Sequence, residues 1–128
     1  NHLNIGAVEN EASGTALTRK AKAVFGDDKI AHAGDLFDLA RAGNEEALKM
    51  IDTAAFDLAV MFSVVAHVAD PDIFVLGGGV MQSSEYFLED LKKEFNNYLF
   101  NYMKDKISVK KAHFDQDAGI IGASLLVF

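Results

Sequence analysis

Residues 70–80 read Asp-Pro-Asp-Ile-Phe-Val-Leu-Gly-Gly-Gly-Val, and the rest of the fold is arranged around this segment. Its four apolar residues, 73–76, lie between a proline turn and a run of glycines, which is typical of a parallel strand covered on both faces. Pro71 ends the preceding helix because proline cannot donate to the helical hydrogen-bond ladder. The glycines leave the backbone bare at the carboxyl end of the strand, where ligands bind in open α/β sheets.

Most of the remaining chain has the apolar period of helices. We expect helices over residues 12–25, 35–42, 45–69, 84–102 and 118–127, and a second strand over residues 107–110. The helix 84–102 joins the two strands, so it predicts a right-handed crossover between parallel strands. The second half of the helix 45–69 is apolar on nearly every side, which predicts a buried helix. The predicted fold class is α/β, mostly helical, with a two-stranded parallel strand-helix-strand unit.

The size of the chain suits one domain. It has 128 residues, of which 50% are hydrophobic and 24% charged, so we treat residues 1–128 as a single unit with its own core. Two short strands are too few for a stable sheet, and the strand 73–76 needs a neighbour on each side to satisfy its backbone. We therefore expect the chain to be a fragment whose sheet is incomplete.

The composition restricts the partners and the compartment. Lys and Arg number 12 and Asp and Glu 19, and the net charge of −7 opposes direct contact with nucleic acid. The sequence has no Cys, which excludes disulfides and thiolate metal sites and predicts a cytoplasmic location. The longest apolar run, 58–69, is shorter than the roughly 20 residues of a membrane span. We expect neither nucleic acid nor a membrane as a partner.

Two motifs are candidates for binding. On local sequence alone, Gly77, Gly78 and Gly79 fit either a ligand-contacting loop or a tight turn, and they form neither a dinucleotide fingerprint nor a P-loop. Glu9 comes just before a predicted helix, where an acidic residue commonly only favours the helix N-terminus. No two histidines are spaced for a metal site on one helix, and no nucleophile is placed with a base, so we predict no catalytic residue and no metal ligand.

Four segments resemble, in this order, the C-terminal part of the ROK family (repressor, open reading frame, kinase). They are residues 9–14, 37–44, 70–80 and 118–123. The resemblance implies a two-lobed, actin-like (ribonuclease H-like) ATPase fold, in which a sugar binds between the lobes and ATP lies against the second lobe. This chain would be the C-terminal part of such a lobe.

The resemblance also implies roles for particular residues. Gly77, Gly78 and Gly79 match the loop that contacts adenosine, and Glu9 matches the glutamate that contacts sugar hydroxyls. The zinc motif of the family would end at Ala7 and place its middle Cys at His2, so we expect zinc to be absent. The phosphate loops and the general-base Asp of family kinases have no counterpart in these residues. The parent protein would use ATP and Mg²⁺, whereas this chain alone would be inactive.

The residues leave more than one function open. The first is the nucleotide- and sugar-contacting domain of an ATP-dependent sugar kinase of hexose type. The alternative is the sugar-sensing effector domain of a ROK-type transcriptional repressor, and the missing zinc cysteines favour the kinase. A third is a dimerisation module without a ligand. Because the incomplete sheet bares apolar surface, we expect a homodimer or higher homo-oligomer, formed through the helix surface 56–68 or the strand edge.

Overall fold

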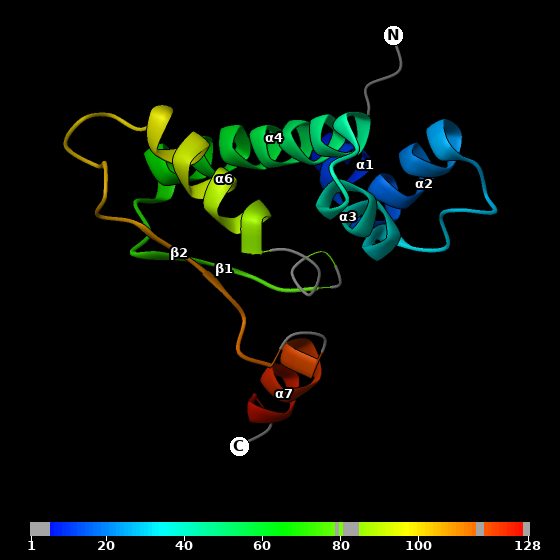
Figure 1. The fold of residues 1–128 in the computed structure, drawn as a ribbon. Coiled ribbons are helices and arrows are strands. Elements are labelled where there is room, and N and C mark those ends of the chain that lie inside the picture. Colours follow the sequence, from blue (N-terminus) through cyan, green and yellow to red (C-terminus); the bar gives the residue numbers. More distant parts are fainter. Residues whose placement is uncertain (1–5, 79, 81–84, 115–116, 127–128) are drawn as a thin grey trace, which may run out of the picture.

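A computed structural model describes residues 6–78, 80, 85–114 and 117–126. In chain order the elements are α1 (Ala7–Ala12), α2 (Gly14–Phe25), α3 (Ala33–Arg41), α4 (Glu45–Ala69), β1 (Ile73–Leu76), α6 (Glu85–Asn97), β2 (Ser108–Lys111) and α7 (Ala118–Leu125). Figure 1 shows α1, α2 and α3 gathered at the start of α4, while α6 crosses the second half of α4. The two strands run beneath this helical layer, and α7 lies apart on the other side of the strands.

The predicted parallel strand pair is confirmed. β1 and β2 form a two-stranded parallel sheet in which Ile73 lies opposite Ser108 and Leu76 opposite Lys111. The amide of Ser108 donates to the Asp72 carbonyl at 3.0 Å, and that of Ala112 donates to the Leu76 carbonyl at 2.7 Å. The second strand therefore starts one residue later than predicted, and α6 is the expected crossover helix.

The first predicted helix, 12–25, begins two residues later than expected, at Gly14, and a further helix that was not predicted, α1, precedes it. Ser13 separates them with an extended backbone (φ −74°, ψ 158°), and its side chain accepts a hydrogen bond from the Ala16 amide at 3.1 Å. Serine competes for backbone hydrogen bonds and is a strong N-cap, so α1 ends before Ser13 and α2 begins directly after it. Glu9 consequently lies in the first turn of α1 and not ahead of a helix.

The crossover helix also ends earlier than predicted, at Asn97 instead of residue 102. The Asn96 amide donates to an Asp105 carboxylate oxygen at 3.1 Å, and the Asp105 backbone amide donates back to Asn96 at 3.2 Å. Asp105 has a left-handed backbone with φ of 61°. This reciprocal pair closes the loop after α6, because the Asn side chain satisfies backbone groups outside the helix.

The N-terminus of α3 is fixed by Asp35. Its carboxylate accepts hydrogen bonds from the backbone amides of His32 at 3.0 Å and Ala31 at 2.7 Å. These two bonds hold the pKa of Asp35 below its usual value because they favour the charged carboxylate. The helix thus begins at Ala33, two residues before the predicted start.

The core lies where the helical layer meets the sheet. Phe62 of α4 stacks on Phe74 of β1 with ring centroids 4.4 Å apart, and it meets Phe95 of α6 edge to face at 6.2 Å. Phe37 of α3 meets Phe87 of α6 edge to face at 6.1 Å, which ties the first three helices to the crossover helix. The largest fully buried side chains are Leu17, Ile30, Leu36, Phe37, Phe87, Leu91 and Phe95.

Two predictions of complete burial are wrong for this structure. On α4, Val64 is 59% exposed and Val68 is 84% exposed, although the opposite face of the helix is buried. On β1, Val75 is 61% exposed while Phe74 and Leu76 pack against the core. No described element covers these outer faces. By length and composition alone α4 could cross a membrane, but its face of Ala and Phe residues packs on neighbouring helices as in the core of a globular domain.

We expect Phe37→Ala to lower the free energy of unfolding by about 3–5 kcal/mol, because it leaves a cavity between α3 and α6. Urea denaturation followed by circular dichroism measures this change. Phe100→Ala is the control, since Phe100 is 59% exposed and its removal should cost less than about 1 kcal/mol. Equal losses for the two variants would contradict the placement of the core.

Candidate functional site

The glycine loop follows β1 at its carboxyl end. Gly78 has a φ of 94°, a left-handed conformation that side chains disfavour, and a side chain at this position would meet no heavy atom within 4 Å. Gly77 and Gly78 are both exposed. Gly79 lies outside the described residues. The backbone at the end of β1 is therefore accessible to a flat ligand on its open side.

This loop meets the junction of α1 and α2, which is distant in the sequence. A Cβ atom on Gly14 would lie 3.2 Å from Cγ2 of Val80, the residue directly after the glycines. Val80 is half-buried and packs against the core. The structure thus brings two of the segments singled out in the sequence, 9–14 and 70–80, into contact.

The α1–α2 junction is held together by side chains of α2. Arg19 donates to the Asn10 carbonyl at 2.9 Å and Lys20 donates to the Glu11 carbonyl at 3.0 Å. Lys20 also forms an ion pair with the Glu11 carboxylate, and its hydrogen bond and positive charge lower the pKa of Glu11. These contacts fasten α1 onto α2, so Glu11 has a structural role.

Glu9 differs from Glu11. Its side chain is exposed and, among the described residues, its carboxylate has no hydrogen-bond or ion-pair partner. Its backbone carbonyl accepts a hydrogen bond from the Ser13 amide at 3.3 Å, which links Glu9 to the cap of α2. Glu9 thus belongs to the junction that Val80, the residue after the glycines, contacts through Gly14. Between Glu9 and Gly77 or Gly78, the glycines that the structure describes, no hydrogen bond is present. The sequence could not reveal this arrangement, because nothing in the local pattern pairs Gly14 with Val80.

A separate groove lies between α4 and α6. It has a volume of about 460 Å³, and the residues that line it include Asp52, Phe56, Asp90 and Glu94. Burial raises the pKa of the Asp52 carboxyl, and the charge of Asp90 adds to this effect. The groove shares no lining residue with the glycine loop or with α1, so it is not part of the same site.

The structure does not fit the zinc site of the family motif. Ala7, at the place of its last Cys, offers only a methyl group and begins α1, and His2 lies outside the described residues. In the part of the chain that the structure describes, no group of three or more His, Cys, Asp or Glu side chains could hold a metal ion. We therefore assign no residue to zinc.

Comparison with known sequences identifies relatives among sugar kinases. The chain is 28% identical to a glucokinase of Halalkalibacterium halodurans, over 95% of this chain and 41% of the relative. It is 32% identical to an N-acetylmannosamine kinase of Yersinia pestis, over 94% of this chain and 39% of the relative. The chain thus spans about two fifths of the length of these curated relatives.

Solved structures show the same likeness. The ROK hexokinase of Thermus thermophilus matches with a TM-score of 0.78 at 29% identity, over 92% of this chain and 40% of that one. A ROK family glucokinase of Streptomyces griseus, solved with glucose and AMPPNP, matches with a TM-score of 0.78 at 24% identity, over 93% and 43%. A ROK family transcriptional regulator, a homologue of the E. coli MLC protein, shares the fold with a TM-score of 0.77 at 18% identity, over 96% and 33%.

The family model agrees with these relatives and with the resemblance seen in the sequence. The ROK family model matches residues 4–128, which is nearly the whole chain. The mostly helical chain with its two-stranded parallel sheet therefore shares its fold with part of a ROK kinase structure. The chain belongs to the ROK family.

Proposed function

We propose that the chain is the nucleotide- and sugar-contacting C-terminal domain of an ATP-dependent, cytoplasmic sugar kinase of hexose type. Its curated relatives are named glucokinase and N-acetylmannosamine kinase, and one structural neighbour was solved with glucose and AMPPNP. The observation that carries the proposal is the exposed glycine loop at the end of β1, placed against the junction that presents the unpaired Glu9 carboxylate.

In this proposal the glycine loop receives the adenosine part of ATP. Gly77, Gly78 and Gly79 have no side chains to keep the nucleotide away. The exposed backbone of Gly77 and Gly78 offers amide donors and carbonyl acceptors. Glu9 accepts hydrogen bonds from sugar hydroxyls, for which an ionised carboxylate has two oxygens available. Mg²⁺ would be bound through the phosphates of ATP, and we assign none of its ligands to this chain.

The chain supplies only part of a kinase site. Phosphoryl transfer requires a base for the attacking hydroxyl and groups that hold the γ-phosphate in line with it. The family motifs for these functions do not occur in the 128 residues. The role proposed for this chain is therefore to bind and orient the two substrates.

The alternative remains a sugar-sensing effector domain of a ROK-type repressor. The transcriptional regulator among the structural neighbours has the same fold, which at 18% identity supports the architecture alone. The two functions differ at the glycine loop, because a kinase must bind ATP there whereas an effector needs only the sugar. A dimerisation module would bind neither ligand.

Glu9→Gln should weaken binding of a hexose by about tenfold, because the amide loses the charge-assisted hydrogen bonds of the carboxylate. Titration of the chain with glucose and with N-acetylmannosamine, followed by NMR chemical shifts, measures the affinity. Glu11→Gln is the matched control, since Glu11 is held by Lys20, and it should change the affinity less than about twofold. Equal effects of the two variants would contradict the role of Glu9.

The isolated chain should show no sugar-dependent hydrolysis of ATP, because it has neither the base nor the phosphate loops. A coupled assay for ADP, with glucose or N-acetylmannosamine and Mg²⁺ present, checks this expectation. Turnover that exceeds the buffer blank and survives Glu9→Gln would contradict the assignment of the catalytic groups to the rest of the kinase.

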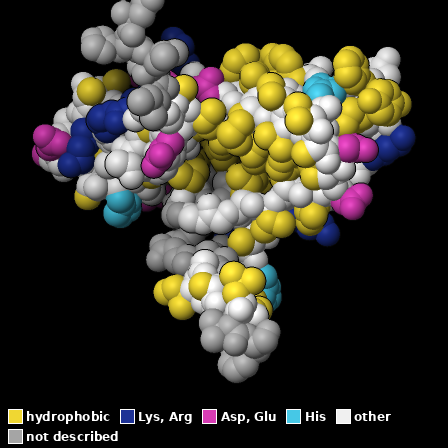
Figure 2. All heavy atoms as spheres, turned by 180° about the vertical axis from the view of Figure 1, so that it is seen from behind, with side chains coloured by type: hydrophobic (Ala, Val, Ile, Leu, Met, Phe, Trp, Pro, Cys, Tyr) yellow, Lys and Arg dark blue, Asp and Glu magenta, His cyan; other side chains and the backbone are white. Residues whose placement is uncertain are grey.

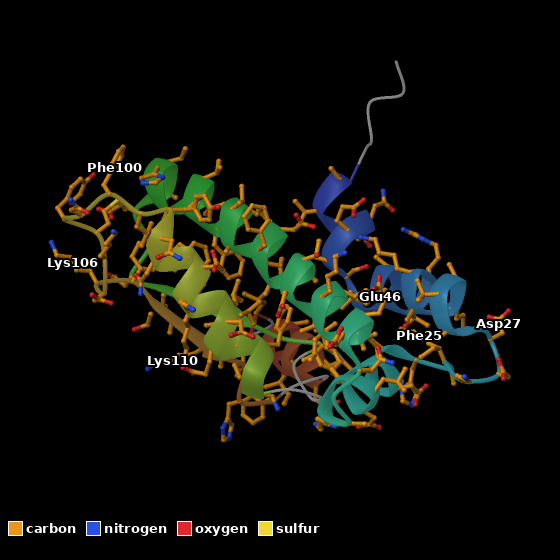
Figure 3. The ribbon with its side chains drawn as sticks, turned by 45° about the horizontal axis from the view of Figure 1, so that its top comes forward. Phe25, Asp27, Glu46, Phe100, Lys106 and Lys110 are labelled. Carbon is orange, nitrogen blue, oxygen red and sulfur yellow. The ribbon has the colours of Figure 1, made fainter. Side chains whose placement is uncertain are left out.

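Self-association is also part of the proposal. In Figure 2, hydrophobic side chains gather on the molecule where α4 runs. The exposed large hydrophobic residues of α4 are Leu48, Phe56, Val64, Val65 and Val68. The second half of the helix carries three of these residues and no Asp, Glu, Lys or Arg, whereas the first half carries charged residues such as Glu46. Figure 3 shows Glu46 and Phe100 toward opposite ends of α4. An exposed apolar face of this size on one half of a helix is typical of an interface.

We expect the chain to sediment as a homodimer or higher oligomer at micromolar concentration. Val64→Glu should shift it toward monomer, because the new carboxylate would be desolvated in the interface. The exposed position leaves the fold intact, which circular dichroism verifies, and Lys49→Glu on the charged half of α4 serves as the control. A wild-type chain that sediments only as a monomer would contradict the expectation.

A further inference from the structure

Gly14 stands at the first position of α2, where its presence calls for an explanation. Glycine is a poor residue for a helix, since it loses more conformational freedom than any other on folding. The glycines that need a positive φ in the described chain are Gly6, Gly26, Gly43 and Gly78, and Gly14 is not one of them. The backbone conformation therefore does not require a glycine here.

The space around Gly14 favours a glycine, because a side chain there would be crowded. A Cβ atom at this position would lie 3.2 Å from Cγ2 of Val80, closer than nearly all real contacts of a Cβ. Val80 cannot retreat freely, because it is half-buried and packs against the core. Because Gly14 has no side chain, it leaves space for the Val80 side chain to pack against the start of α2.

The turn around Gly14, which Val80 contacts, is fixed by hydrogen bonds. The Thr18 hydroxyl donates to the Gly14 carbonyl at 2.8 Å, and the Ser13 side chain caps the same turn by accepting from the Ala16 amide at 3.1 Å. The Ser13 amide donates to the Glu9 carbonyl at 3.3 Å. The surface against which Val80 packs is therefore a hydrogen-bonded turn that is continuous with Glu9.

We propose that Gly14 is a positioning residue: by seating Val80 it fixes the glycine loop at a set place relative to the α1–α2 junction. The inference rests on the proposed function, in which the loop receives ATP and the junction presents Glu9 to the sugar. The contact of Gly14 with Val80 then sets the place of the nucleotide relative to the sugar. Gly14 itself touches neither ligand in this proposal.

The first test uses Gly14→Ala in the 128-residue chain. The variant should stay folded, which circular dichroism verifies, because the crowded contact needs a shift of only a few tenths of an ångström. Its affinity for ATP should nevertheless fall roughly three- to tenfold as the loop shifts. The backbone amide resonances of residues 77, 78 and 80 should move. Gly122→Ala is the matched control, since a side chain at Gly122 would meet nothing within 4 Å, and it should leave both the resonances and the ATP affinity unchanged.

The second test is rescue. Adding Val80→Ala to Gly14→Ala removes the crowded methyl groups and should restore the ATP affinity to within about twofold of the Val80→Ala single variant. Unmoved loop resonances in Gly14→Ala, unchanged ATP affinity, or a loss that the double variant does not repair would each overturn the inference. A wild-type chain that does not bind ATP contradicts the proposed function instead, and the loop resonances of Gly14→Ala then still decide whether Gly14 positions the loop.

Discussion

The stacking of Phe62 on Phe74 is the contact on which the position of the site depends. It joins α4 to β1, and the edge of the Phe95 ring against both aromatic residues adds the crossover helix to the same cluster. Within the described residues β1 has one partner strand, so its place is determined more by this aromatic packing than by a sheet. The glycine loop begins where β1 ends, so the aromatic cluster that fixes β1 also fixes the start of the loop.

The first three helices form the other side of the site. Phe37 packs on Phe87, and the small side chains on the buried face of α4 let α1 and α3 come close. The packing brings the α1–α2 junction to Val80, although the two lie far apart in the sequence. Two separate sets of contacts therefore build the site: β1 packs on α4 through the aromatic cluster, and the first three helices pack on α4 and α6. A change in either set would shift the glycine loop relative to Glu9.

The comparison with the sequence shows where local patterns suffice. The parallel strands and their crossover followed from an apolar run between Pro71 and the glycines, because that chemistry leaves few alternatives. The short helix α1 and the cap at Ser13 were missed, because six residues carry too little apolar pattern to indicate a helix. The early end of α6 at Asn97 was missed because the apolar period of that segment continues beyond the helix. Residues 77–78 and Glu9 were found as motifs, but the contact between Gly14 and Val80 is tertiary and leaves no signal in either segment.

The arrangement has a consequence for a kinase of two lobes. Transfer of a phosphate requires the sugar hydroxyl and the γ-phosphate to be held at a set separation. In the proposed function, the residues that contact both substrates belong to one hydrogen-bonded and packed unit, which runs from Glu9 through Ser13 and Gly14 to Val80. The other lobe would then supply the general base and the groups that bind the phosphates of ATP. It would not have to fix the distance between the sugar and the nucleotide. In a kinase this contact would serve to place two substrates relative to each other, whereas a sugar-sensing effector would have only one ligand to place.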